Sequence, residues 1–396
     1  MICLADLPAV LSPAQVMDCL RAPQNGEWAL LDLREEGEAA EGHPFGAVNL
    51  PYSRLELDLP HLVPRRQTPL VLFDGGDAVA DIAAQRLARL GYAKISVVAG
   101  GAQGWQAAGL PLFKGVHTFS KAFGEWVQHQ FDVPEIGPDQ LAALRASANP
   151  HTLIDGRPLP EHQAFTLPDA INCPNADLAL RLPSILAADM PVVVHCAGRT
   201  RSIIGAQTMR DFGLPNPVVA LRDGTQGWEL SGRQRDIGAN RPVPDPAPND
   251  IAAATMRARR VIAAQGLPTV TAAQLSTWLA QDTCTTYLFD PRGDATPPDG
   301  FHAVHGTTLI QQTDRFIAVK GARVVLWDPC LVRSTFASLW LTRMGIEAYV
   351  LLDPPPPLAP IAAPAQHDLP PELTPQQLSD ALAQGATVLD LRPAAA

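Results

Sequence analysis

The sequence lacks closely spaced cysteines. Its six cysteines are scattered over 396 residues, and no two of them form a C-x-x-C pair. Zinc centres and thioredoxin-type dithiols use such pairs, and disulfide frameworks belong to much shorter, cysteine-dense chains. We therefore expect a cytoplasmic protein whose thiols are mostly buried, with no metal ion and no organic cofactor.

The chain also has little positive charge and no long apolar run. Thirty Lys and Arg residues stand against forty Asp and Glu residues, a formal net charge of -10, which argues against a nucleic-acid-binding protein. No stretch approaches the roughly 18 apolar residues that span a bilayer. Asp6 interrupts the first ten residues, so we expect no signal peptide. Neither a nucleic acid nor a membrane is an expected partner, and composition leaves the oligomeric state open.

An apolar segment that ends in Asp-x-Arg occurs four times. The four segments are Leu30–Arg34, Leu153–Arg157, Leu288–Arg292 and Val388–Arg392. A second apolar run follows the first three at a similar distance and ends at Asp74, Cys196 and Asp328. Continuous apolar runs indicate strands buried on both faces, and their alternation with helical patterns predicts α/β repeats with a mainly parallel sheet flanked by helices.

Composition suggests where the repeats begin and end. We expect repeat one at 1–115, repeat two at 130–238, repeat three at 265–355 and the start of a fourth repeat at 370–396. The proline-rich stretches 241–248 and 354–371 are typical of linkers. The fourth segment holds only a helix and one strand, too little for a core of its own. We interpret it as truncated or as a remnant docked on its neighbours.

The candidate catalytic residue is Cys196, at the end of the second strand of repeat two. A thiol at a strand-to-helix turn meets free backbone N–H groups and the positive end of the helix dipole, which favour a thiolate or another anion. Glycine lets the loop curl tightly, and two arginines add positive charge. The expected substrate-binding residues are Ala197, Gly198, Arg199, Thr200, Arg201 and Ser202.

These features together resemble a known family. The order of Asp155-x-Arg157, the strand to Cys196, its Arg-containing loop and Gly227-Trp228 is similar to a rhodanese (thiosulfate sulfurtransferase) domain. Repeat one resembles the same domain throughout, including a segment, Gly46–Pro51, that mirrors Asp169–Pro174. The resemblance is weaker in repeat three and partial in the fourth segment. It implies tandem rhodanese-like domains, each with a five-stranded sheet.

The resemblance also implies a chemistry for Cys196. The thiolate would attack the outer sulfur of thiosulfate, release sulfite and pass the sulfur of its persulfide to cyanide or a cellular thiol. The loop N–H groups would hold the persulfide, and Arg199 and Arg201 would bind the sulfonate oxygens. Thiosulfate, 3-mercaptopyruvate, glutathione persulfide and a protein persulfide all fit a basic loop, and the two arginines favour thiosulfate.

The other repeats are expected to be inactive, because Asp74 and Asp328 stand at the position of Cys196. Two further thiols are secondary candidates: Cys330, in the corresponding loop of repeat three, and Cys173, a possible resolving partner in repeat two. Both are expected to be buried. We expect Asp155 and Arg157 to be structural, and His195 to point away from Cys196.

Two other functions stay open. A cysteine-based phosphatase or arsenate reductase would suit His195-Cys196 followed by arginine, but tyrosine phosphatases place that arginine at the position held here by Ser202. A non-catalytic binding or regulatory module would suit the two repeats that lack the nucleophile. Cys196→Ser would distinguish a binding function, which should survive, from turnover, which should not.

Overall fold

The computed structural model describes residues 9–22, 26–147, 149–187, 189–293, 295–361 and 372–389. The chain divides into two compact units, Met1–Pro360 and Ile361–Ala396. The described part of the second unit contains helix α16 (Pro375–Ala383), capped by Thr374, whose side chain accepts a hydrogen bond from the backbone N–H of Gln377. The Asp-x-Arg of the fourth segment, Asp390 to Arg392, lies outside the described residues.

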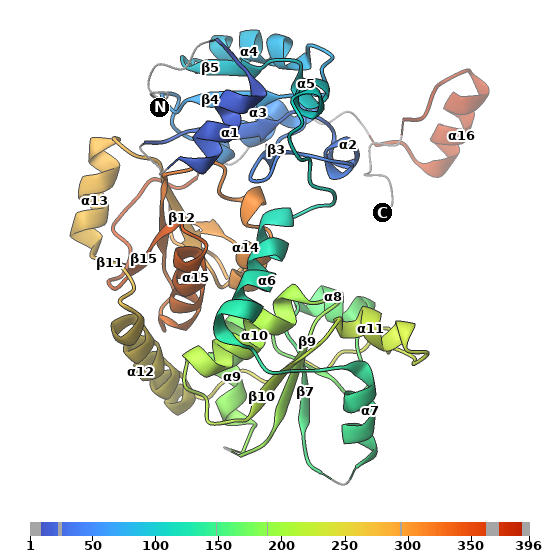
Figure 1. Cartoon of the computed structure of the whole chain (residues 1–396), viewed down its shortest axis with the longest axis vertical. Helices are drawn as coiled ribbons and strands as arrows, with labels where there is room; N and C mark the ends of the chain where they lie inside the picture. Colours follow the sequence, from blue (N-terminus) through green and yellow to red (C-terminus); the bar gives the residue numbers. More distant parts are fainter. Residues whose placement is uncertain are drawn as a thin grey trace. The chain divides into compact units, whose positions relative to one another are not determined.

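The first unit contains three five-stranded sheets with the same strand order (Figure 1). Repeat one has the order β1-β5-β4-β2-β3, repeat two β6-β10-β9-β7-β8 and repeat three β11-β15-β14-β12-β13. Neighbouring strands within these sheets are parallel. The predicted fold class, repeated α/β domains with five-stranded parallel sheets, is therefore confirmed, while the predicted domain boundaries stay predictions.

The elements of each repeat follow in chain order. Repeat one contains β1 (Val10–Leu11), α1 (Pro13–Arg21), β2 (Ala29–Asp32), α2 (Glu36–Ala40), β3 (Val48–Asn49), η2 (Tyr52–Arg54), α3 (Leu55–Leu62), β4 (Leu70–Phe73), α4 (Val79–Arg89), β5 (Ile95–Val98) and α5 (Gly101–Ala107). Repeat two contains α6 (Thr118–Phe131), β6 (Glu135–Ile136), α7 (Pro138–Ala146), β7 (Thr152–Asp155), α8 (Leu159–Ala164), β8 (Ile171–Asn172), η3 (Asn175–Asp177), α9 (Leu178–Arg181), η4 (Leu182–Ser184), β9 (Val192–His195), α10 (Thr200–Asp211), β10 (Val218–Leu221) and α11 (Gly224–Leu230). Repeat three contains α12 (Pro248–Gln265), β11 (Thr269–Val270), α13 (Ala272–Gln281), β12 (Thr286–Asp290), β13 (His302–Ala303), α14 (Gly306–Gln311), η5 (Thr313–Arg315), β14 (Arg323–Leu326), α15 (Val332–Arg343) and β15 (Glu347–Leu351). None of the helices in the described ranges combines the length and apolar character needed to cross a membrane.

The strand that leads to Cys196 is covered on both faces. Val192 and Val194 belong to the large apolar cluster on one face of the sheet, whereas Val193 packs in a second cluster on the other face. Successive side chains of a strand point to opposite faces, so an uninterrupted apolar run is what burial on both sides requires. Figure 1 shows α9 and α10 on one side of this sheet and α7 and α11 on the other.

The Asp-x-Arg motif forms a local ion pair in all three sheets. The Nε atoms of Arg34, Arg157 and Arg292 each donate to the aspartate two residues earlier at 2.9 Å. In repeat two the pair is fully buried, and Thr166 donates to the same aspartate at 2.8 Å. Bidentate pairs of this kind fix the turn that follows the first central strand. The motif is thus structural.

The similar segments Gly46–Pro51 and Asp169–Pro174 each contain an asparagine with the same structural role. Asn172 donates to the backbone carbonyls of Asp155 and Arg157 at 3.3 and 2.7 Å. Asn49 makes the same two bonds in repeat one, at 3.0 and 2.8 Å. Each asparagine therefore joins the short edge strand to the turn after the first central strand.

Repeats two and three contact each other through polar groups between helices. The indole N–H of Trp340 donates to Thr208 at 3.0 Å, and Arg343 pairs with Asp211 at 2.5 Å. These bonds join α10, the helix that follows the Cys196 loop, to α15, its counterpart in repeat three.

Candidate functional site

Cys196 is the first residue after β9 and is 2% exposed. The backbone carbonyls of Cys196 and Ala197 accept hydrogen bonds from the N–H groups of Thr225 and Gln226, both at 2.9 Å. These donors lie at the start of α11, so the first turn of that helix is hydrogen-bonded to the backbone carbonyls of the Cys196 loop. Gly224 makes the approach possible: its φ is +51°, and a Cβ there would lie 2.2 Å from the Cys196 carbonyl oxygen. The loop therefore requires a glycine at position 224, three residues before Gly227-Trp228.

The N–H groups of the loop face the other way. Among the described residues, no hydrogen-bond acceptor is found for the backbone N–H groups of residues 197 to 202. Several of them begin α10, a helix of 12 residues. Free donors beside the thiol, at the positive end of a helix, can hold a negatively charged sulfur.

Two side chains fix the shape of the loop. Ser202 is buried, and its hydroxyl donates to the carbonyls of Arg199 and Leu221 at 2.6 and 3.2 Å. The side chain of Asn175 donates to the carbonyl of Arg201 at 2.8 Å. Thus Ser202, predicted to bind substrate, has its hydroxyl committed to the backbone, and its N–H is the group that remains for an anion.

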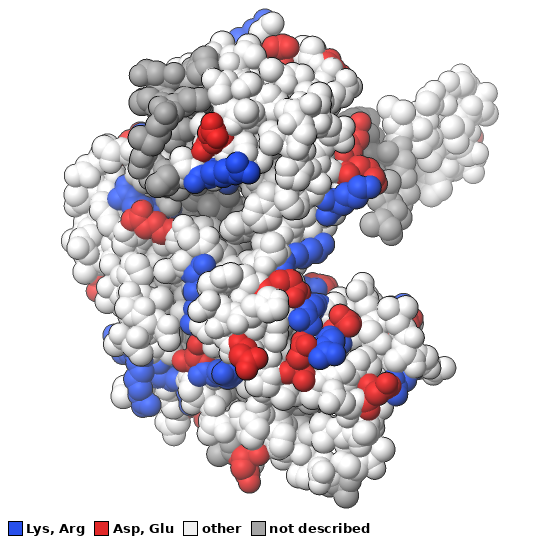
Figure 2. All heavy atoms as spheres, in the orientation of Figure 1, with Lys and Arg blue, Asp and Glu red and all other residues white. Residues whose placement is uncertain are grey.

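Both arginines of the loop are paired with carboxylates from other elements. Arg199 donates to Glu125 of α6 and to Glu135 of β6, each at 2.8 Å. Arg201 makes a two-pronged pair with Glu161 of α8, at 2.6 and 2.8 Å. Figure 2 shows the same pattern more widely, with blue side chains beside red ones on the described part of the face drawn. The positive charge expected from sequence is present but compensated.

The three glutamates were missed at the level of sequence, because each is distant from the loop along the chain. Glu125 lies in the helix that joins repeats one and two, and Glu161 follows Arg157 by four residues. The position of Glu125 gave one signal. It lies in a helix that leads directly into repeat two, and such a helix must pack on some part of that repeat. In the structure α6 packs on α10: a Cβ on Gly124 would lie 2.7 Å from a side-chain carbon of Thr200.

Burial and charge shift two pKa values beside the thiol. Burial alone would lower the pKa of Arg201, but its hydrogen bond to Glu161 and its electrostatic interaction with Cys196 raise it above the usual value. Burial lowers the pKa of His195 to about 4. His195 is fully buried, and its Nε2 has no hydrogen-bond acceptor or donor among the described residues. It is therefore neutral at pH 7.

The corresponding loops of repeats one and three hold a carboxylate where repeat two has the thiol. Asp74 accepts hydrogen bonds from the N–H groups of Gly76 and Ala80, at 2.9 and 3.0 Å. Asp328 accepts from the N–H and the hydroxyl of Ser334, at 2.9 and 2.7 Å. In these two repeats the side chain of the loop itself occupies the anion-binding N–H groups.

The other cysteines of these regions are not activated. Burial, together with the charge of Asp328 at 2.9 Å, raises the pKa of Cys330 to about 12. Burial also raises the pKa of Cys173 well above its usual value. Both groups are buried as expected, and neither environment favours a thiolate.

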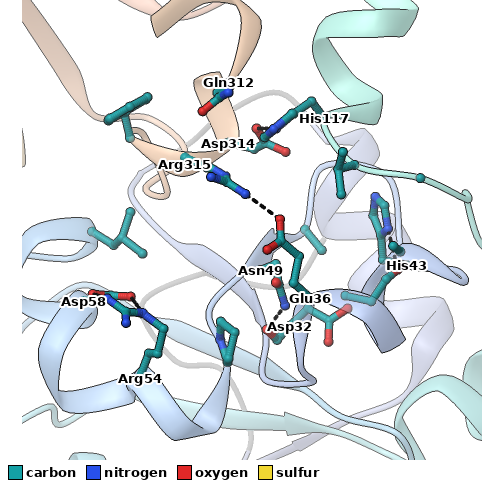
Figure 3. A pocket seen from close by; sticks show the side chains of 18 of the residues that line it. Asp32, Glu36, His43, Asn49, Arg54, Asp58, His117, Gln312, Asp314 and Arg315 are labelled. Carbon is teal, nitrogen blue, oxygen red and sulfur yellow. Dashed lines mark hydrogen bonds and ion pairs between the residues drawn. The ribbon is translucent and has the colours of Figure 1, made fainter. Parts of the chain in front are cut away.

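A cavity of about 560 Å³ lies apart from Cys196, between α2 and α3 of repeat one and η5 of repeat three (Figure 3). Its charged side chains face one another: Arg315 pairs with Glu36, and His117 with Asp314 at 2.8 Å. It includes neither Cys196 nor any residue of the Cys196 loop. We interpret this cavity as part of the polar interface between repeats one and three.

The geometry is that of α/β repeats, one of which has a cysteine as the first residue of its strand-to-helix loop. A family model described as a rhodanese-like domain matches residues 16–108 and 137–231. A crystal structure of thiosulfate sulfurtransferase from Pseudomonas aeruginosa is 38% identical, with a TM-score of 0.86 over 95% of this chain and 73% of that chain. The chain belongs to the rhodanese family, as the sequence motifs predicted.

Curated relatives point the same way. A 3-mercaptopyruvate sulfurtransferase from Escherichia coli is 26% identical over 263 residues, 56% of this chain and 90% of that protein. An HTH-type transcriptional regulator from Mycobacterium tuberculosis is 39% identical over 97 residues, 24% of this chain and 42% of that protein. The chain thus spans less than half the length of that regulator. Similarity in structure and sequence to two sulfurtransferases sets it within a sulfurtransferase family.

Proposed function

We propose that the protein is a sulfurtransferase of the thiosulfate sulfurtransferase type, with Cys196 as its nucleophile. The thiolate attacks the outer sulfur of thiosulfate or a related anionic donor, a new S–S bond forms, and the bond to the sulfonate sulfur breaks with release of sulfite. The persulfide then passes its outer sulfur to cyanide or a thiol, which restores the thiolate. No cofactor takes part in this scheme.

One observation carries the proposal: no backbone N–H group of residues 197 to 202 has an acceptor among the described residues, whereas a loop carboxylate accepts from two backbone N–H groups in repeat one and from one in repeat three. Residues 197 to 202 would supply these donors to the persulfide anion, worth several kcal/mol in similar oxyanion sites, about 3 for one donor. Arg199 and Arg201 would add positive charge beside them.

Intact-mass measurement tests this function. The protein is incubated with thiosulfate beside a Cys196→Ser variant. We expect a gain of one sulfur on the wild type that is absent from the variant and discharged by cyanide. No gain with thiosulfate, persulfide donors or 3-mercaptopyruvate would reject the enzyme. A binding module or a cysteine-based phosphatase would then remain to be tested.

A further inference from the structure

We propose that Glu125, Glu135 and Glu161 select the charge of the sulfur donor. By neutralising the arginines of the Cys196 loop, they make the site prefer donors with at most one negative charge over the thiosulfate dianion. This inference rests on sulfur transfer through Cys196 and concerns which donor the same site accepts.

The three carboxylates and the arginines around the loop form one connected cluster. Glu135 bridges Arg199 and Arg222, accepting from each at 2.8 Å through different oxygens. Glu125 adds a second carboxylate to Arg199, and Glu161 pairs with Arg201. Three positive side chains therefore face three negative ones, and the cluster contributes no net charge.

Some of the N–H groups of Arg199 and Arg201 already donate hydrogen bonds to these glutamates. Arg201 commits both terminal nitrogens to Glu161, and Arg199 commits Nε and one terminal nitrogen to two glutamates. A sulfonate can still reach the remaining N–H groups of these guanidinium groups, but it meets arginines whose charge is already compensated by carboxylates. The side chain of Glu135 is only 18% exposed, so repulsion between a dianion and this glutamate is weakly screened, whereas Glu161 and Glu125, at 41% and 48%, are screened more strongly by solvent.

The backbone donors suit a smaller charge. The N–H groups of residues 197 to 202 are neutral and gather at one helix start, where a single anionic sulfur is stabilised. An alkyl persulfide meets this requirement: the Cys196 thiolate bonds to its terminal sulfur, the old S–S bond breaks, and the leaving thiolate takes the proton of the terminal sulfur. With 3-mercaptopyruvate the C–S bond breaks instead, and the thiol proton moves to the carbon of the pyruvate released.

The test compares donors of different charge on the full chain. Loading of Cys196 is followed by intact mass in wild type and in E125Q, E135Q and E161Q, with thiosulfate and with an uncharged-tail alkyl persulfide. We expect each amide to raise the second-order rate constant for thiosulfate about fivefold, because a dianion loses one like charge nearby. The rate constant for the persulfide should change less than twofold, and added salt should shrink the difference.

A matched control removes a carboxylate elsewhere in repeat two. Asp169 is exposed and pairs with Arg145 at 2.8 Å, so D169N should leave both rate constants unchanged. Slower thiosulfate loading in the three glutamate variants would overturn the proposal, since the carboxylates would then be holding the arginines ready for a sulfonate. Equal changes for both donors would overturn it as well. Absence of loading from every donor in the wild type would instead reject the proposed function, and this inference with it.

Discussion

The loops of repeats one and two occupy the same place in the fold but differ in sequence and in backbone: Ala78, before α4, has a φ of +65°, whereas Arg199, before α10, has a φ of -126°. In repeat two the carbonyl of Cys196 accepts from Thr225, and in repeat one the carbonyl of Asp74 accepts from Ala102, at 2.9 and 2.8 Å. Behind both loops stands a glycine with positive φ, Gly224 or Gly101. Yet the N–H groups above the strand bind a carboxylate of the loop in repeat one and lack such an acceptor in repeat two.

This difference teaches that the anion-binding geometry belongs to the fold and not to catalysis alone. A loop that gathers N–H groups at a helix start leaves donors that need an acceptor, and residues 197 to 201 are only half-buried. An aspartate satisfies some of them permanently: Asp74 accepts from two backbone N–H groups and Asp328 from one. A cysteine satisfies them only as a thiolate or persulfide, which ties the stability of the loop to its chemistry.

The largest effect is expected when the aspartate found at this position in repeat one, Asp74, is introduced at the corresponding position of repeat two. We expect Cys196→Asp to abolish sulfur loading, at least a thousandfold, because the carboxylate cannot carry a persulfide and occupies its donors. Persulfide formation is measured by intact mass. Cys284→Ser, a change at a half-exposed thiol in repeat three, should keep full loading. Sulfur on the Cys196→Asp protein would mean that another thiol is the nucleophile.

A second test compares the thiols of repeats two and three. Since the pKa of Cys330 is about 12, its thiolate fraction at pH 7.5 is on the order of 10⁻⁴ or less. We expect iodoacetamide to label Cys196 at least a hundredfold faster, as measured by peptide mass mapping. Asp328→Asn should speed labelling of Cys330 about tenfold by removing the adjacent charge. Equal labelling of the two cysteines would contradict the distinction drawn between their loops.

A third test uses His195, whose position is held by Phe73 in repeat one. The folded-state pKa of about 4 lies below the reference value of 6.5, so the unfolded chain binds this proton first as the pH falls. The contribution of neutral His195 to the free energy of unfolding is therefore complete above pH 6.5 and is lost as the pH falls toward 4. Between pH 7 and 4.5 we expect a loss of roughly 2 kcal/mol in unfolding free energy.

Urea unfolding at the two pH values measures this loss, and His195→Phe should remove that share of it. Acid sensitivity as large in the variant as in the wild type would show that other groups cause it.

The smallest effect concerns the carboxylate of repeat one. Asp74→Ala leaves the N–H of exposed Gly76 and that of buried Ala80 without their acceptor, and we expect α4 to lose about 1.5 kcal/mol of local stability. Hydrogen exchange of the α4 amides reports this loss. Gln85→Ala, at an exposed position of α4 itself, should change it by less than about 0.5 kcal/mol. If the two variants exchange alike, Asp74 does not hold the loop.

Much of this arrangement could be predicted from the sequence, because local patterns determine it. The apolar runs predicted β4, β9 and β14, the Asp-x-Arg motif marked a structural turn, and the position of Cys196 before a helix indicated a nucleophile. The surroundings of the arginines could not be predicted, since Glu125, Glu135 and Glu161 lie on three other elements and meet the loop only after folding. Nothing local in Arg199-Thr-Arg201 shows that its charge is compensated.

Helix α6 has a consequence for how such repeats can be exchanged between proteins. The family match to repeat two begins at residue 137, after α6 has ended. Yet α6 supplies Glu125 to the Cys196 loop, and at its other end Ser120 donates to the Gln311 carbonyl of repeat three at 2.6 Å. A gene fusion that cut at the family boundary would separate the loop from a side chain that balances its charge. Recombination that keeps the chemistry of this repeat must inherit the preceding helix with it.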